Sequence, residues 1–164
     1  MSDDEVRKIR VLVVDDDSNV RTVVAIHLRQ LGFEVEPASN GFEAFNILAG
    51  YGRTPFDADV ILLDLLMPVM DGYEFLERYE GCVPVVVMSG LGDIAKLPRQ
   101  PFALVVKPMS MFEAADTLRE AALSWRTHEC PLCMASCRCP EGNDMTPRRG
   151  DRTCVHECEG DDSK

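Results

Sequence analysis

Acidic residues follow two apolar segments of the 164-residue sequence, at points where they could act together. Asp15 and Asp16 come directly after the run at 11–14, and Asp64 comes directly after the run at 60–63. Runs that are continuous in Val, Ile and Leu are typical of strands buried on both faces of a parallel sheet. If the two strands are neighbours, the three carboxylates meet and remain ionised only with a cation among them. Their oxygen atoms favour Mg²⁺ as that cation.

A hydroxyl and an ammonium group are expected at the same edge of the sheet, because Ser89 and Lys107 each follow a further apolar run. A carboxylate, a metal ion, a hydroxyl group and an ammonium group suit phosphoryl transfer. In this reaction the Asp64 carboxylate would attack phosphorus and form an acyl phosphate. Acids at strand ends can also be helix caps, an interpretation that fits Asp17 or Ser18 at the start of the next helix.

The strands that must position these groups alternate with helical patterns. Strands are expected at residues 11–14, 33–37, 60–63, 85–88 and 104–106. The last helix is expected over residues 111–125, with Ser110 and Glu113 as its capping box. Strands alternating with helices predict an α/β fold of the flavodoxin-like, doubly wound kind. Its five parallel strands would follow the order 2-1-3-4-5, with the ligand crevice beyond strands 1 and 3.

Two other side chains could be mistaken for reactive groups. His27 falls on the apolar stripe of the first expected helix, together with Val23, Val24 and Leu28. It is therefore expected to pack in the core rather than to carry a phosphoryl group. Cys82 is expected to be a small buried residue before the strand at 85–88.

Composition and charge exclude several classes of partner. The formal net charge is −11, and Lys and Arg form no cluster of the kind that contacts nucleic-acid phosphates, so no DNA partner is expected. No apolar run approaches the roughly 20 residues needed to span a bilayer, so no membrane insertion is expected. Residues 1–8 are acidic and polar, unlike a secretory signal, and a cytoplasmic location is expected.

The cysteines predict a second region, which divides the chain into residues 1–127 and a Cys/His-rich tail, residues 128–164. The tail holds six of the seven cysteines and has little apolar surface to bury. A structural Zn²⁺, in contrast, contributes about 10–16 kcal/mol to folding. Zinc binding is therefore expected, with an iron–sulfur cluster, thiol redox chemistry and disorder as open alternatives. The candidate zinc ligands are Cys130, Cys133, Cys137, Cys139, Cys154, His156 and Cys158.

Four motifs of the first region resemble the response-regulator receiver family of two-component signalling. They occupy residues 11–17, 62–72, 88–90 and 105–108, and the resemblance covers roughly residues 9–126. By this resemblance, Asp64 is the phosphoacceptor. The Mg²⁺ ligands would be Asp15, Asp16, Asp64 and the backbone carbonyl of Leu66. Ser89 and Lys107 would sense the phosphoryl group.

The resemblance also implies backbone features and has departures. Lys107–Pro108 would be a cis peptide, and Gly72 would permit a tight turn before a short third helix. The family usually carries an aromatic residue three positions before the lysine, where this chain has Leu104. Phe102 is expected on the same side of that strand. The fourth helix is expected to be a short remnant around residues 92–97.

The leading functional hypothesis is a stand-alone response regulator without a DNA-binding domain. It would accept a phosphoryl group from a sensor histidine kinase or a phosphotransfer protein, and then switch its binding to a protein target that the sequence does not identify. It would catalyse only its own phosphorylation and dephosphorylation. One alternative is a metal- or redox-sensing scaffold with the tail as the sensor. Another is an Asp-nucleophile phosphatase, whose motif needs a second Asp where Leu66 stands.

Overall fold

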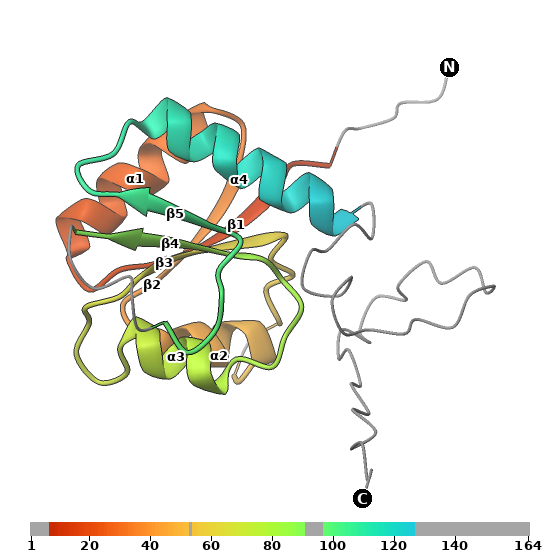
Figure 1. The fold of residues 1–164 in the computed structure, drawn as a ribbon. Helices are drawn as coiled ribbons and strands as arrows, with labels where there is room; N and C mark the ends of the chain where they lie inside the picture. Colours follow the sequence, from red (N-terminus) through yellow and green to blue (C-terminus); the bar gives the residue numbers. More distant parts are fainter. Residues whose placement is uncertain (1–6, 53, 91–96, 127–164) are drawn as a thin grey trace, which may run out of the picture.

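The computed structural model describes residues 7–52, 54–90 and 97–126, with only the backbone of residues 125 and 126. In this part of the chain, strands and helices alternate as expected up to β4 (Figure 1). The strands are β1 (Arg10–Val14), β2 (Glu34–Ala38), β3 (Val60–Asp64), β4 (Val85–Ser89) and β5 (Ala103–Val106). The helices are α1 (Ser18–Gln30), α2 (Gly41–Ala49), α3 (Gly72–Arg78) and α4 (Met111–Arg126).

The strands form one parallel sheet in the order β2-β1-β3-β4-β5, which confirms the predicted flavodoxin-like topology. Because all strands run the same way, their carboxyl ends meet at one edge of the sheet. The paired positions near that edge are Val14 with Leu63, Asp64 with Met88, and Ser89 with Val106. The sheet therefore brings the candidate residues on β3 and β4 to the same edge.

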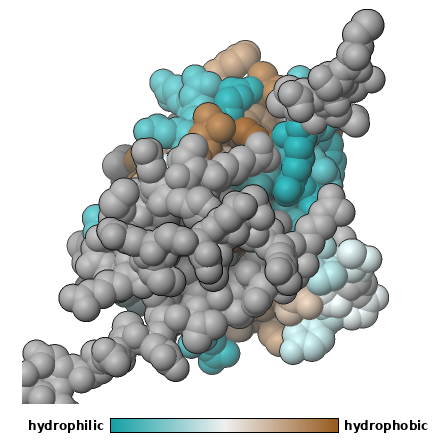
Figure 2. Space-filling model, turned by 90° about the vertical axis from the view of Figure 1, so that its right-hand side faces the viewer, coloured by the Kyte–Doolittle hydropathy of each residue, from teal (hydrophilic) through white to brown (hydrophobic). Residues whose placement is uncertain are grey.

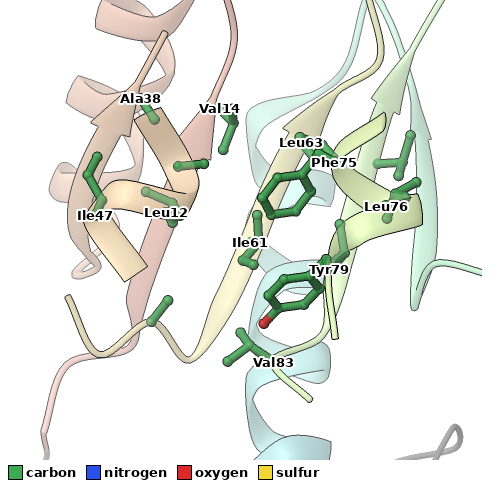
Figure 3. Packing of buried hydrophobic residues seen from close by; sticks show 14 of the residues in the cluster. Leu12, Val14, Ala38, Ile47, Ile61, Leu63, Phe75, Leu76, Tyr79 and Val83 are labelled. Carbon is green, nitrogen blue, oxygen red and sulfur yellow. The ribbon is translucent and has the colours of Figure 1, made fainter. Parts of the chain in front are cut away.

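Helices cover both faces of the sheet. The α2–α3 face has a core in which Leu12, Ile61 and Leu63 of the sheet pack against Phe75 of α3 (Figure 3). The rings of Phe75 and Tyr79 stack with centroids 5.2 Å apart. The other face is covered by α1 and α4, and its core includes Leu28 and Leu118, which are both fully buried. Figure 1 shows the two helix layers above and below the sheet.

Capping side chains fix where three helices begin. Asp17, Asn40 and Asp71 each accept a hydrogen bond from a backbone N–H two or three residues later, at 2.8–2.9 Å. These side chains satisfy amide groups that have no partner within the helix. Since Asp17 and Asp71 follow β1 and β3 closely, the caps hold the first turns of α1 and α3 beside the edge where the acids lie.

The inward face of α1 differs from the one predicted. Val24, Ala25 and Leu28 are buried, whereas Val23 and His27 are exposed, so the expectation of a core histidine is wrong. The ring nitrogen Nδ1 of His27 lies 2.8 Å from the carbonyl oxygen of Val23, one turn earlier. A helix on a sheet buries only one stripe, and His27 lies just beyond its margin.

The region around β5 contains a second correction. Phe102 precedes β5 and packs in the α1–α4 core with Ala103 and Val105, not on the side of Leu104. Strand alternation cannot place it, because it lies outside the strand. Leu104 itself is 40% exposed. The short helix expected around residues 92–97 falls almost wholly outside the described residues.

Three smaller predictions concern β2, α3 and Cys82. β2 begins one residue later than predicted, α3 is short as predicted, and Cys82 is buried as predicted.

Figure 2 views the end of the molecule opposite the tips of β4 and β5, where small hydrophobic areas lie among hydrophilic ones. Among the described residues, no helix is both long and apolar enough to span a bilayer.

Candidate functional site

The turn after β1 is built around the carboxylate of Asp15. The side chain is buried, with 2% of its surface exposed. Its oxygen Oδ1 accepts a hydrogen bond from the backbone N–H of Asp17 at 2.9 Å. The N–H of Asp15 itself donates to the carbonyl of Ala38 on β2, at 3.1 Å. The neighbouring Asp16 is exposed, so the turn offers one buried and one solvent-facing carboxylate.

Arg21 also holds this turn, and the sequence did not single it out. Its guanidinium donates a 2.6 Å hydrogen bond to the backbone carbonyl of Asp15. The contact places a positive charge next to the acidic turn without pairing it with a carboxylate. The sequence feature that could have predicted this contact is the position of Arg21 in the first turn of a helix that begins after Asp17. A side chain at such a position points back toward the turn before the helix.

The carboxylates of Asp15, Asp16 and Asp64 come together as predicted, since ligand atoms from all three lie within 4.8 Å of one another. Lys107 joins them from the end of β5. Its Nζ donates to Asp15 Oδ2 and to Asp64 Oδ1, both at 2.9 Å. The Lys107–Pro108 peptide is cis, which confirms that expectation.

The protonation equilibria reflect this crowding. Burial has the largest effect on Asp64 and raises the pKa of its carboxyl; Lys107 lowers it and Asp15 raises it, and the pKa ends above its ordinary value. Burial would lower the pKa of Lys107, but its hydrogen bonds and charge interactions with both carboxylates outweigh burial and raise that pKa. One ammonium group shared by two carboxylates keeps its proton yet does not neutralise both acids.

The donor set fits a hard divalent cation. Three carboxylates and one ammonium group leave a net negative charge in a space less than 5 Å across. Carboxylate oxygens beside open solvent suit Mg²⁺, which keeps several of its waters. Leu66 lies two residues beyond Asp64 along the chain, and its carbonyl as a further ligand stays a prediction.

Ser89 lies at the same edge, at the end of β4, and is buried. Its hydroxyl donates to the carbonyl of Gly90 at 2.7 Å, rather than to any of the acids. The backbone N–H of Lys107 donates to the carbonyl of Ser89 at 2.8 Å, so the two residues are held side by side.

The loop between β3 and α3 passes very close to the phosphoacceptor candidate. A Cβ atom at Gly72 would lie 2.3 Å from the backbone oxygen of Asp64, so this position requires glycine for space. Glycine thus permits the close return of the chain before α3 by leaving space beside the β3 backbone, and not through a positive φ, which Gly72 does not have. Val69 does, with φ 73°, which is rare for a β-branched residue and costs about 1–3 kcal/mol.

The candidate zinc ligands of the tail, residues 128–164, lie outside the described residues. Leu104, which stands where the resemblance led us to expect an aromatic residue, lies on β5 opposite Val87 of β4. Among the described residues, the candidate site consists of five side chains from the ends of β1, β3, β4 and β5, namely Asp15, Asp16, Asp64, Ser89 and Lys107.

Comparison with known proteins agrees with this geometry. A family model described as the response regulator receiver domain matches residues 11–118. A probable transcriptional regulator, ycf27, of Guillardia theta is 35% identical over 118 residues, which are 68% of this chain and 44% of that protein. The regulatory protein AtoC of Escherichia coli is 32% identical over 63% of this chain and 23% of its own length. The chain thus spans less than half the length of these relatives.

Solved structures show the same architecture. The chemotaxis protein CheY4 of Vibrio cholerae aligns with a TM-score of 0.58 and 26% identity, over 70% of this chain and 99% of that one. The receiver domain of a signal transduction histidine kinase from Syntrophus aciditrophicus aligns with a TM-score of 0.61 and 25% identity. That alignment covers 70% of this chain and 90% of the other.

Proposed function

This chain belongs to the response-regulator receiver family of two-component signalling; from that premise, we propose that it accepts a phosphoryl group on Asp64 in a magnesium-dependent reaction. Receivers are phosphorylated by histidine kinases, and we propose a sensor histidine kinase or a phosphotransfer protein as the donor. The observation that carries the proposal is the meeting of Asp15, Asp16 and Asp64 within 4.8 Å, with Lys107 bonded to two of them.

Asp64 is the acid best placed to act as the nucleophile. It ends the central strand β3, its side chain is 11% exposed, and its Oδ1 is already oriented by Lys107. In the reaction, a carboxylate oxygen would form the bond to phosphorus while the bond from phosphorus to the donor's nitrogen breaks. The products are an acyl phosphate on Asp64 and the free imidazole of the donor, which takes up a proton.

The other residues would stabilise charge around the transferred group. Asp15 and Asp16, with Asp64 and the carbonyl of Leu66, would hold Mg²⁺, which neutralises charge on the phosphoryl oxygens when it is bound. Lys107 would turn from the Asp64 carboxylate toward one of those oxygens. Ser89 would release the Gly90 carbonyl and donate to another. Catalysis then rests on positioning and electrostatics.

The proposed partners of this chain are proteins. Its net charge of −11 opposes contact with nucleic-acid phosphates. One relative named above is a probable transcriptional regulator. The proposal of protein partners concerns only the direct contacts of residues 1–164. For residues 128–164 we propose zinc binding through the cysteines and His156, which the spacing of these residues supports.

Incubation with acetyl phosphate, a small phosphodonor, tests the proposal. The full chain should gain one phosphoryl group in the presence of Mg²⁺, none after chelation with EDTA, and none in the Asp64→Asn variant. The product should be labile to base, as acyl phosphates are. Steady release of phosphate from a small phosphomonoester would instead favour the phosphatase alternative.

A further inference from the structure

A cleft lies between helix α1 and the edge strand β2, on the face of the sheet that α1 and α4 cover. Its volume is about 250 Å³. It is lined by two cationic side chains, one hydroxyl group and three small or apolar side chains, namely Arg21, Arg29, Thr22, Ala25, Ile26 and Pro37. Four of these residues, Thr22, Ile26, Arg29 and Pro37, are exposed, so the cleft is shallow. A small molecule would keep much of its surface in water there, and the cleft suits a peptide better.

The cleft is positively charged although the chain as a whole is strongly acidic. The formal net charge of the chain is −11, yet α1 contains no Asp or Glu. Arg21 and Arg29 are about two helical turns apart, so their Cα atoms are separated by about 12 Å along the helix. Thr22, Ala25 and Ile26 lie between them along the helix. The cleft therefore has a cation toward each end, with uncharged side chains between the two.

Both guanidinium groups are held in place by the backbone. Arg21 donates to the carbonyl of Asp15 at 2.6 Å, and Arg29 donates to the carbonyl of Val35 at 2.8 Å. Within the described ranges, neither arginine forms an ion pair with a carboxylate. A guanidinium group has five N–H donors. Each arginine therefore keeps donors for a further carboxylate, and such charge-assisted hydrogen bonds are stronger than neutral ones.

The acidic residues of β2 do not neutralise the cleft. Val35 packs in the α1–α4 core, so Pro37, two residues later, lies on the same face of the strand. Glu34 and Glu36 alternate with them and lie on the other face. Glu34 pairs with Arg10, with Oε1 and Nε 3.2 Å apart. The positive charge of the cleft therefore faces solvent without a carboxylate from β2 beside it.

We infer that this cleft is the docking site for residues 159–162 of the chain's own tail, which we call the acidic segment. Three of its four residues are acids, namely Glu159, Asp161 and Asp162. In an extended conformation the first and last of these are about 10 Å apart, close to the separation of the two arginines. The segment follows Cys158, the last candidate zinc ligand, so the inference does not depend on zinc binding.

Docking would also connect the tail to the candidate site. Arg21, which would bind the acidic segment, donates to the carbonyl of Asp15. The carboxylate of Asp15 in turn accepts a hydrogen bond from Lys107. The docked segment would therefore contact a side chain that positions the candidate site.

Helix α4, which leads into the tail, touches the end of α1, so the acidic segment can reach the cleft. The two helices cover the same face of the sheet (Figure 1). Arg119 of α4 donates to the carbonyl of Leu31 at 3.1 Å, and Leu31 caps α1 just after Arg29. About 30 residues separate the end of α4 from the acidic segment, which is ample for the distance. Exposed ion pairs are individually weak, but a tethered segment has an effective concentration up to the millimolar range.

Two other occupants are less suited to the cleft. Residues 3–5 are also acidic, but they precede Arg7, which pairs with Asp59 just before β3. The cleft borders β2, which lies on the other side of β1 from β3. The acidic segment of a second copy has the same charges but lacks the tether. Cross-linking distinguishes all three occupants.

Carbodiimide cross-linking tests the inference, because the reagent joins an amine to a carboxylate only where the two are in contact. Thr22→Lys places an amine in the cleft of the full chain, and Lys is a better helix former than Thr. Arg29→Lys is a second carrier of the amine, in case the first disturbs α1. Arg78→Lys is the matched control on the opposite face, where Arg78 pairs with Glu74 at 2.7 Å. Peptide mass spectrometry of the monomer identifies the linked residues.

Both carriers should be linked from the cleft to the acidic segment, whereas Arg78→Lys should be linked to Glu74 and not to the tail. Removing a cation from the cleft should weaken the contact. The yield of the link in Thr22→Lys combined with Arg29→Gln should therefore be about fivefold lower than in Thr22→Lys combined with Arg78→Gln, which has the same net charge.

Other patterns of linkage would overturn the inference. They are links from the cleft to residues 3–5 in place of the acidic segment, links to the acidic segment only within cross-linked dimers, and no link to it in either carrier. Equal yields in the two double variants would also overturn it, because the cleft would then not attract the segment. So would a link from position 78 to the acidic segment as strong as the link from the cleft.

Discussion

Replacing Gly72 with Ala should disturb both the stability of the fold and the position of Asp64. The added Cβ would lie 2.3 Å from the backbone oxygen of Asp64 and 2.8 Å from Cα of Leu65. Both are backbone atoms, so no flexible side chain can move aside. An ordinary contact would require a shift of about 1 Å, taking 2.3 Å as the starting distance.

Opposing effects set the size of the change in the free energy of unfolding. Overpacking against a fixed neighbour costs roughly 1–3 kcal/mol, and loss of the hydrogen bond from the Gly72 N–H to the Leu65 carbonyl costs about 1 kcal/mol more. Alanine in a helix gains about 0.5–1 kcal/mol over glycine. The clash is the larger effect, so Gly72→Ala should lower the free energy of unfolding by about 2 kcal/mol.

Urea denaturation followed by circular dichroism measures this loss, and acetyl phosphate labelling measures the effect on Asp64. A 1 Å displacement of a reacting group can cost up to roughly a hundredfold in rate. Gly90→Ala is the control, because a Cβ at Gly90 would meet nothing within 4 Å. Its free energy of unfolding should stay within about 0.5 kcal/mol of the wild type. Wild-type stability and labelling in Gly72→Ala would refute the packing of this loop.

The charges of the site and the cysteines of the tail lead to three further predictions. Burial raises the pKa of the Asp64 carboxyl above its ordinary value of 3.8. The folded state therefore keeps the carboxyl proton to a higher pH than the unfolded state does. Without Mg²⁺, the free energy of unfolding should fall as the pH rises from 3.8 through the raised pKa. Asp64→Asn should remove that fall, which urea midpoints at acid and neutral pH would reveal; an unchanged pH profile would contradict it. Lys107→Met should lower stability without Mg²⁺ by about 1–2 kcal/mol, a value reduced for the 31% exposure of this side chain, and added Mg²⁺ should restore part of the loss. Native mass spectrometry should find one or two Zn²⁺ ions that are lost on deleting residues 128–164, whereas a metal-free full-length chain would exclude the zinc proposal.

Much of the fold was predictable because its strands are buried on both faces. Continuous runs of Val, Ile and Leu mark the central strands β1, β3 and β4, and such strands leave few topologies open. The acids could be placed for the same reason, since Asp15 and Asp64 directly follow the cores of adjacent strands. The cis Lys107–Pro108 peptide was predicted only from the resemblance to the receiver family.

Other features depend on contacts that sequence patterns do not encode. His27 lies at the margin of the buried stripe of α1, where a small rotation of the helix decides between core and solvent. Phe102 lies just outside β5, so period-two alternation does not apply to it. The positive φ of Val69 contradicts its local preference, and the hydrogen bond from Arg21 to the Asp15 carbonyl depends on how the turn after β1 closes.

The role of Gly72 shows a related difficulty. A glycine before a helix predicts a turn, yet here the requirement is space beside the Asp64 carbonyl. Only the packing of α3 against the end of β3 reveals this requirement. Similarly, Lys107 was expected to contact a phosphoryl group, whereas the structure shows its ammonium group donating hydrogen bonds to the carboxylates of Asp15 and Asp64.

Locating the phosphoryl group tests the central claim most directly. The full chain would be treated with acetyl phosphate and Mg²⁺ and then with sodium borohydride, which reduces an aspartyl phosphate to homoserine. Peptide mass spectrometry should find homoserine at position 64 in the wild type, and none when Mg²⁺ is chelated. Homoserine at another aspartate, or a phosphoryl group that survives on a different residue in the Asp64→Asn variant, would contradict the assignment of Asp64 as the acceptor.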